Sequence, residues 1–176
     1  MPENANSVLR EDVIKFSGII NDENISRLIS YISTLDINAP LRIYFTTPGG
    51  EINNGDIFID YLNHLVKNGK IITLIASWEM SSMGLIIPLK ANCDIELLNT
   101  YSILHIGTRN LDYRESLKKD SIESFNYIIL EKTNQRLLKL YEESGITEQE
   151  IDSIKRGNDV FLDTERLRCL IKHRGN

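Results

Sequence analysis

A serine that could act as a nucleophile lies where an apolar segment gives way to a helix. Residues 71–76 are apolar and partly β-branched, which predicts a buried strand, and residues 77–81 interrupt that run with polar and mixed side chains. The apolar pattern resumes at Met83, where we expect a helix to begin. A serine at a strand-to-helix turn can project its hydroxyl from the top of a sheet, and the first helical N–H groups point toward charge that develops beside it. Ser82 is therefore the candidate nucleophile, with the N–H of Met83 as one oxyanion donor.

A plain structural role for these serines competes with this interpretation. Either Ser81 or Ser82 could cap the helix that begins at Met83, and N-cap serines greatly outnumber nucleophilic ones. The segment alone therefore favours capping, and the choice depends on what the rest of the chain offers.

His105 is the candidate general base. It belongs to an apolar segment, residues 102–106, that predicts a short strand, whereas His64 falls in an expected helix and His173 in a polar tail. A histidine that closes a buried strand is more often a hydrogen-bonded packing residue than a base, so that alternative stays open.

Asp159 is the candidate that could orient an imidazole. It precedes the apolar residues 160–162, which predict a short strand or sheet edge. An aspartate in a turn or at a helix cap is the alternative, and Asp152 and Asp163 are nearby competitors for the role.

The turn Thr47-Pro48-Gly49-Gly50 could supply further N–H groups to the same site. It lies between an expected strand over residues 41–46 and a helix, and two consecutive glycines allow backbone conformations and close ligand approaches that other residues block. A plain tight turn is the alternative, since Pro-Gly often makes one. Taken together, the chain offers a nucleophile, a base, an orienting carboxylate and two sources of oxyanion N–H groups.

Composition excludes several classes of protein. The chain has 176 residues, a net charge of −5 and 41% hydrophobic residues, which fits a single domain over residues 1–176 with a substantial core. No basic surplus exists to neutralise nucleic-acid phosphates. Cys93 and Cys169 fit neither a disulfide framework nor a metal site, so we expect reduced thiols and no metal or other cofactor. No secretory signal and no apolar run of about 20 residues is present, so we expect a soluble, cytoplasmic protein.

Strands and helices alternate along the chain, which indicates parallel βαβ crossovers and the α/β class. The expected strands cover residues 13–20, 41–46, 71–76, 94–98 and 102–106. One expected helix covers residues 25–35, a second contains residues 57–66 and ends at Gly69, and a third follows Ser82. Asn21 and Asp22 offer caps for the first of these helices. Residues 1–11 are polar, and we expect them to be loose.

The second half of the chain begins with a long helical pattern. It covers residues 113–144, which exceeds a typical globular helix, so part of it could project or serve an interface. Thr147 and Glu150 then form a capping-box pattern that opens a short helix, and Asp163 offers a cap for the last helix.

Three blocks give the chain a resemblance to the proteolytic subunit of the Clp protease, the ClpP family of serine peptidases, over residues 13–171. The turn at residues 47–50, with Gly55 after it, resembles the family's Ser-Pro-Gly-Gly turn. Residues 82–84, Ser-Met-Gly, resemble its nucleophile block, and residues 159–162 resemble its Asp-Arg-Phe-Leu block. His105 follows Ser82 by 23 residues, where the family places its catalytic histidine.

The resemblance implies a serine endopeptidase with a Ser-His-Asp triad. By this match Ser82 is the nucleophile, His105 the general base and Asp159 the residue that orients it. The N–H groups of Gly50 and Met83 would form the oxyanion hole.

The resemblance also implies a fold and an assembly. The fold is the ClpP/crotonase-like spiral of βαβ units, and the long helix at 113–144 corresponds to the handle region through which two rings stack. We therefore expect a homo-oligomer, a heptameric ring or a stacked double ring, that encloses a chamber for unfolded polypeptides or short peptides. An unfoldase ATPase is the implied partner, with no role for nucleic acid or membrane.

Several departures from the family pattern leave alternatives. Residues 78–81, Trp-Glu-Met-Ser, stand where the family has a glycine and small residues, so we expect a bulkier approach to Ser82. Ile106-Gly107-Thr108 replaces the segment that holds extended peptide in the family, and Asn158 replaces a basic residue. A catalytically inactive or partner-activated ring subunit is one alternative. A crotonase-type acyl-CoA enzyme, which would not need the three triad residues together, is the other.

Overall fold

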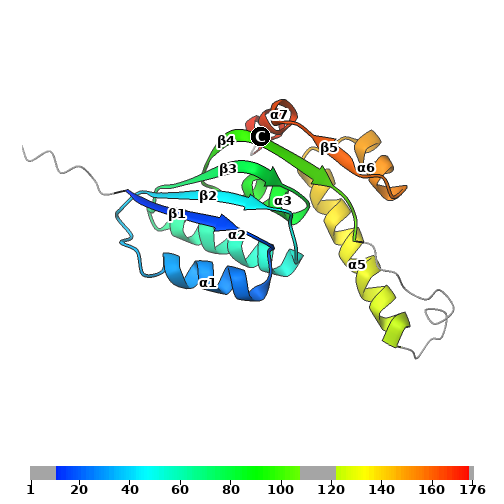
Figure 1. The fold of residues 1–176 in the computed structure, drawn as a ribbon, viewed down its shortest axis with the longest axis horizontal. Coiled ribbons are helices and arrows are strands. Elements are labelled where there is room, and N and C mark those ends of the chain that lie inside the picture. The colour runs from blue at the N-terminus through cyan, green and yellow to red at the C-terminus, as the bar shows by residue number, and fades with distance from the viewer. Residues whose placement is uncertain (1–10, 108–121, 175–176) are drawn as a thin grey trace, which may run out of the picture.

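A five-stranded sheet forms the centre of the protein. The structure is a computed structural model that describes residues 11–107 and 122–174. Strands β1 to β4 are parallel and adjacent in chain order, and β5 pairs with β4 in the antiparallel direction (Figure 1). The strands are β1 (Asp12–Ser17), β2 (Leu41–Thr47), β3 (Ile72–Met80), β4 (Asp94–Leu104) and β5 (Val160–Leu162).

The helices connect the parallel strands and then continue beyond the sheet. In Figure 1, α1 and α2 lie together along one face of the sheet, α5 runs diagonally away from it, and α6 and α7 gather near β5. The helices are α1 (Asp22–Ile32), α2 (Ile52–Lys67), α3 (Met83–Lys90), α5 (Ile122–Glu143), α6 (Glu148–Lys155) and α7 (Thr164–Lys172). The predicted α/β class is confirmed.

Alternation along the first two strands builds the core under α1 and α2. Ile14 and Phe16 of β1 are buried while their neighbours in the strand are exposed or half-buried, as the two-residue period of a strand requires. Phe16 stacks on Phe45 of β2 with ring centroids 4.7 Å apart, and Phe45 stacks on Phe58 of α2 at 5.8 Å. Burial of these three rings packs α2 against β1 and β2 and so fixes the helix on the sheet.

The helix caps predicted from the sequence are present. Asn21 accepts a hydrogen bond from the N–H of Asn24 over 2.9 Å at the start of α1. Thr147 and Glu150 form a complete capping box on α6, and the Asp163 side chain accepts from the N–H of Arg166 at the start of α7. These contacts satisfy N–H groups that a helix leaves unpaired in its first turn.

Four of the predicted strands have the wrong bounds. The first strand, predicted over 13–20, ends at Ser17, and Ile20 makes only an isolated bridge to Gly50. The third strand, predicted to stop at residue 76, continues to Met80. The predicted strands 94–98 and 102–106 are one strand, β4, which ends at Leu104.

Bulges explain the last two differences. The β2–β3 register shifts between Phe45 and Thr47, and the β3–β4 register shifts between Ser77 and Glu79. Trp78 and Asn99 adopt positive φ values of 69° and 40° at these irregularities. A bulge places extra residues in one strand, and pairing resumes beyond it. The polar residues that predicted a strand end therefore lie at a bend within β3 and within β4.

The long helix is described from Ile122 to Glu143 as α5. Residues 113–121 of the predicted 113–144 helix lie outside the described residues, as do residues 1–10 of the N-terminal segment predicted to be loose. Among the residues that the structure describes, no helix is long and apolar enough to cross a membrane.

Candidate active site

Ser82 occupies a strained turn between β3 and α3. It is the N-cap residue of α3 with φ 52° and ψ −126°, a conformation that side-chain-bearing residues rarely adopt and that costs on the order of 1–3 kcal/mol. Its side chain makes no capping hydrogen bond, and its N–H donates to the carbonyl of Ile103 over 3.0 Å. The capping role considered for the Ser82 side chain is therefore not realised.

The neighbouring serine is committed to other contacts. The Ser81 hydroxyl accepts a hydrogen bond from the N–H of Ile103 over 3.0 Å and donates to the Glu79 carboxylate over 2.9 Å. These bonds tie the end of β3 to β4 directly before the Ser82 turn. Ser81 therefore serves to fix this turn, and it does not cap α3 either.

The glycine turn at residues 47–50 packs directly against the Ser82 turn. Gly49 has φ 100°, and its N–H donates to the Thr47 hydroxyl over 3.0 Å. A Cβ added at Gly49 would lie 2.6 Å from the Ser81 carbonyl oxygen and 2.7 Å from the Ser82 Cβ. Only glycine fits here, both because of its φ and because the two turns touch.

Two backbone N–H groups at this junction have no acceptor among the described residues. Within the described chain, the N–H groups of Gly50 and Met83 donate to no protein acceptor. Gly50 is held in place by its neighbours, since Ile20 donates to the Gly49 carbonyl over 2.9 Å and accepts from the N–H of Glu51 over 2.8 Å. Met83 lies in the first turn of α3, where an unpaired N–H is expected.

The pairing of β4 with β5 brings His105 and Asp159 together. Leu104 pairs with Val160 at the end of the antiparallel ladder, so the next residues outward, His105 and Asp159, lie opposite each other. Both line one cavity of about 380 Å³, together with Glu79 and Ser81 among others.

Asp159 and the nearby Asp163 differ in their hydrogen bonds. In the described residues, the Asp159 carboxylate accepts no hydrogen bond, so it acts neither as a turn aspartate nor as a cap. The nearby Asp163 is the cap of α7 and accepts from the N–H of Arg166 over 2.8 Å. Asp159 thus remains available to a partner in the cavity.

No direct hydrogen bond joins Ser82, His105 and Asp159 in the part of the chain that the structure describes. The His105 Nδ1 atom faces the carbonyl of Ile106 at 3.4 Å, a long contact. Catalytic hydrogen bonds are often long or absent without substrate and tighten when it binds. His105 and Asp159 thus share one cavity, which Ser82 does not line, and the three candidates form no connected triad in the described residues.

Tyr141 of α5 is a residue of this junction that sequence reasoning missed. Its side chain is 0% exposed, and its hydroxyl donates to the His105 carbonyl over 3.3 Å. Burial raises the pKa of Tyr141 to about 12, and the nearby Ser82 side chain and His105 backbone partly offset this rise. The sequence showed it only as one apolar position of a long helix.

The segment after His105 is also anchored to α5. Asn134 accepts from the N–H of Gly107 over 2.8 Å and donates to the Gly107 carbonyl over 3.0 Å. Nothing in the sequence pattern marked Asn134 for this role. The long helix α5 therefore contacts the backbone around His105 at two points, through Tyr141 at His105 itself and through Asn134 at Gly107.

Of residues 78–81, which the sequence suggested would crowd the approach to Ser82, Glu79 and Ser81 line the cavity that contains His105, and Trp78 does not. The Trp78 side chain is 70% exposed and does not line the cavity that contains His105. The bulge turns it to solvent, whereas Glu79 lines the cavity and contributes a carboxylate beside Asp159. The sequence alone could not distinguish the two, because the bulge reverses the alternation of strand side chains.

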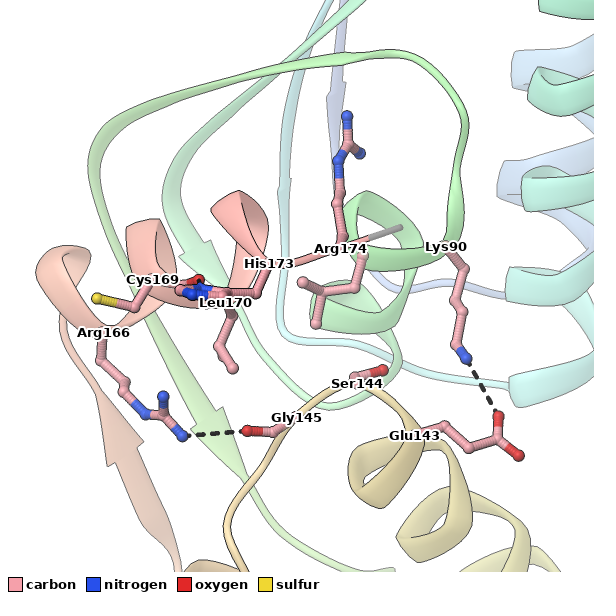
Figure 2. Close-up of a pocket in the computed structure, with 10 residues that line it drawn as sticks. Lys90, Glu143, Ser144, Gly145, Arg166, Cys169, Leu170, His173 and Arg174 are labelled. Carbon is pink, nitrogen blue, oxygen red and sulfur yellow. Dashed lines mark hydrogen bonds and ion pairs between the residues drawn. The ribbon is translucent and has the colours of Figure 1, made fainter. Parts of the chain in front are cut away.

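A second cavity of about 380 Å³ lies at the C-terminal end of α3 and is lined by cationic side chains, among them Lys90, Arg166 and Arg174 (Figure 2). Its cationic groups are already paired: Lys90 with Glu143 at 3.1 Å, and Arg166 with the Gly145 carbonyl at 3.2 Å. Arg174 donates to the Pro88 carbonyl over 2.6 Å. These contacts hold α7 and α5 to the C-terminal end of α3. Among the described residues, no group of three or more His, Cys, Asp or Glu could hold a metal ion.

Comparison with known protein families shows where the chain belongs. The family model described as Clp protease matches residues 3–169 of the chain. None of the curated proteins compared with the chain matches it.

Proposed function

Because the chain belongs to the Clp protease family, we propose that it is a serine endopeptidase that cleaves unfolded polypeptides or short peptides. The observation that carries this proposal is the backbone of Ser82, whose φ of 52° lies in a turn against the Gly49–Gly50 turn. Such strain in a side-chain-bearing residue persists where surrounding contacts enforce it, and it is concentrated at active sites.

The proposed mechanism is acyl transfer to Ser82. His105 takes the proton from the Ser82 hydroxyl as its oxygen attacks the peptide carbonyl, and the oxyanion that develops is bound by the N–H groups of Gly50 and Met83. His105 then returns the proton to the leaving amine. Water, activated by the same histidine, releases the acyl group and restores the serine.

Asp159 is the proposed partner of the His105 imidazole. Its place opposite His105 beyond the β4–β5 ladder, with its carboxylate free of other hydrogen bonds in the described chain, supports this role. A carboxylate there would fix the ring orientation and stabilise the imidazolium that forms during attack.

The proposal includes an assembly. In keeping with the family, we propose a homo-oligomeric ring, heptameric or stacked in pairs, with a possible unfoldase ATPase as its partner. The long α5 helix, which leaves the sheet in Figure 1, supports a role in contacts between rings. The free thiols of Cys93 and Cys169 favour a reducing compartment such as the cytoplasm.

A partner-activated ring subunit is the second candidate function. The observation that favours it is that no hydrogen bond connects Ser82 to His105, or His105 to Asp159, within the described residues. In this case assembly or a partner would move the three side chains into contact, and the isolated chain would be inactive.

Peptide hydrolysis by the assembled protein tests the proposal. We expect cleavage of fluorogenic peptides by the wild type, with turnover reduced at least about 10³-fold in Ser82→Ala and in His105→Ala, because each removes a member of the triad. Ser81→Ala serves as the matched control and should retain cleavage. Equal activity in Ser82→Ala and the wild type would overturn the proposed nucleophile.

A further inference from the structure

The cavity that contains His105 is acidic. Two carboxylates line it, those of Glu79 and Asp159, and no lysine or arginine is among the lining residues that the structure describes. Its other hydrophilic side chains, the Ser81 hydroxyl and the Asn158 amide, are uncharged. A cleft lined by charges of one sign concentrates groups of the opposite sign. A cationic side chain would therefore enter this cavity more favourably than a neutral or an acidic one.

The basic side chains directly before the cavity segment at residues 157–159 bind other partners. Lys155 pairs with Glu142 over 3.7 Å, and the Arg156 Nε donates to the Asp152 carbonyl over 3.0 Å. Neither basic side chain lines the cavity. The end of α6 therefore leaves the carboxylates of the cavity without a cationic partner.

Glu79 presents its carboxylate in a fixed position. Its N–H donates to the Thr46 hydroxyl over 3.2 Å, which ties its backbone to β2. Its Oε1 atom accepts a hydrogen bond from the Ser81 hydroxyl over 2.9 Å, and the Ser81 residue is only 2% exposed. In the described chain Oε2 accepts no hydrogen bond, so one carboxylate oxygen remains for a ligand. Because the carboxylate is held before a ligand arrives, little binding free energy is lost in ordering it.

The cavity adjoins the turn that carries the candidate nucleophile. Ser82 does not line it, but Ser81, the residue directly before Ser82, does. Pro48, directly before the Gly49–Gly50 turn, lines it as well. The volume of about 380 Å³ lies in the range of sites that bind small ligands. A peptide whose carbonyl lies at Ser82 would thus have a neighbouring side chain beside this cavity.

We propose that Glu79 is a specificity-determining residue that selects substrates with a lysine or an arginine close to the scissile bond. The inference rests on the proposed function, since it takes the cavity as part of the substrate site. Within that function the Asp159 carboxylate is assigned to the His105 imidazole, so Glu79 supplies the charge that meets the substrate. Lysine and arginine carry their charge at the end of a long side chain, which suits a carboxylate beside the nucleophile's turn.

Glu79→Gln tests this role because it removes the charge and keeps an oxygen that can accept from Ser81. The substrates are internally quenched peptides of one sequence that differ only by lysine, glutamine or glutamate at one position, which is moved in turn to each side of the scissile bond. At one such position we expect the wild type to favour lysine over glutamine about three- to ten-fold in kcat/KM and to disfavour glutamate. In Glu79→Gln the lysine-to-glutamine ratio should fall to about one.

Glu96→Gln is the matched control. It removes a β4 carboxylate that pairs with Arg42 over 2.7 Å and does not line the cavity, so it changes the net charge equally and should keep the wild-type ratio. The wild-type preference should also weaken as salt is added, because an ionic contact that solvent reaches is screened. Loss of packing alone would slow all the peptides together and leave the ratio between them unchanged.

The outcomes separate this inference from the proposed function. Cleavage with equal kcat/KM for the lysine and glutamine peptides at every position, or a lysine preference that persists in Glu79→Gln, would overturn the role of Glu79 and leave the peptidase function standing. Binding of the same peptides to assembled Ser82→Ala, followed by fluorescence anisotropy, tests the selection without turnover. Tighter binding of the lysine peptide that Glu79→Gln abolishes would support the role of Glu79 even if the wild type cleaves nothing, whereas equal binding of the two peptides would overturn it.

Discussion

At the level of single residues, Ser82 and Gly49 depend on each other. Ser82 holds a positive φ of 52° without glycine's freedom, and Gly49 approaches it so closely that a Cβ would lie 2.7 Å from the Ser82 Cβ. The strained turn and the glycine turn therefore form one unit. The sequence indicated both turns through the Ser-Met-Gly block at residues 82–84 and the Pro-Gly-Gly block at residues 48–50.

Gly49→Ala should disable this unit more than it destabilises the fold. The added Cβ would displace the Ser82 turn, so we expect labelling by a fluorophosphonate to fall at least about 10²-fold, as for loss of an oxyanion donor. The free energy of unfolding in urea should fall by about 1–3 kcal/mol, from the unfavourable φ and the clash.

Gly69→Ala is the matched control for that experiment. Gly69 also has a positive φ, 89°, but a Cβ there would meet no atom within 4 Å. It should lose about 1 kcal/mol of stability and label at the wild-type rate. Equal labelling rates for the two alanine variants would contradict the contact between the two turns as the cause.

At the level of elements, the strand ends show where sequence patterns were insufficient. Residues 77–81 lack the apolar alternation of a strand, yet β3 continues to Met80 because the bulge at Trp78 lets pairing resume at Glu79. A bulge is stabilised by long-range pairing with β2 and β4, which no local pattern reports. The helix caps were predictable for the opposite reason, since a cap involves residues only three apart.

The hold of α5 on the His105 segment can be tested at Asn134. Asn134→Ala removes both hydrogen bonds to Gly107, so we expect fluorophosphonate labelling to slow several-fold while the free energy of unfolding falls by about 1 kcal/mol or less, because the site is solvent-exposed. Gln135→Ala, at an exposed position of the same helix, is the control. If both variants label at the wild-type rate, α5 does not position His105 through the hydrogen bonds of Asn134 with Gly107.

The junction of α6 and α7 should make stability sensitive to acid. Burial disfavours the ionised form of Glu150, but hydrogen bonds from Arg166 and Thr147 outweigh it and lower its pKa below the ordinary 4.5. A carboxylate with a depressed folded-state pKa stabilises the fold above its unfolded value, and that stabilisation is lost as pH falls through the folded value.

Glu150→Gln should therefore be less stable than the wild type at pH 7 and approach it as pH falls below about 4.5. The measurement is the urea midpoint from pH 7 to pH 3. Glu148→Gln, in the first turn of the same helix, is the matched control for the loss of one carboxylate. A constant difference between Glu150→Gln and the wild type across this range would show that ionisation of Glu150 is not the cause.

At the level of the whole molecule, the order of elements was more predictable than the contacts between them. Alternating strand and helix patterns indicated parallel crossovers, and the sheet has four parallel strands in chain order. The candidate triad residues were each found at an element end. The contacts of Tyr141 and Asn134 with the site could not be predicted, because they depend on how α5 crosses the end of β4, which is a tertiary arrangement.

The central claim is that Ser82 is an activated nucleophile, and intact-mass detection of fluorophosphonate labelling tests it most directly. The account predicts one adduct per chain on the wild type and on Ser81→Ala, and none on Ser82→Ala or on heat-unfolded protein. An adduct that persists in Ser82→Ala, or no adduct on folded and assembled wild-type protein, would contradict the claim.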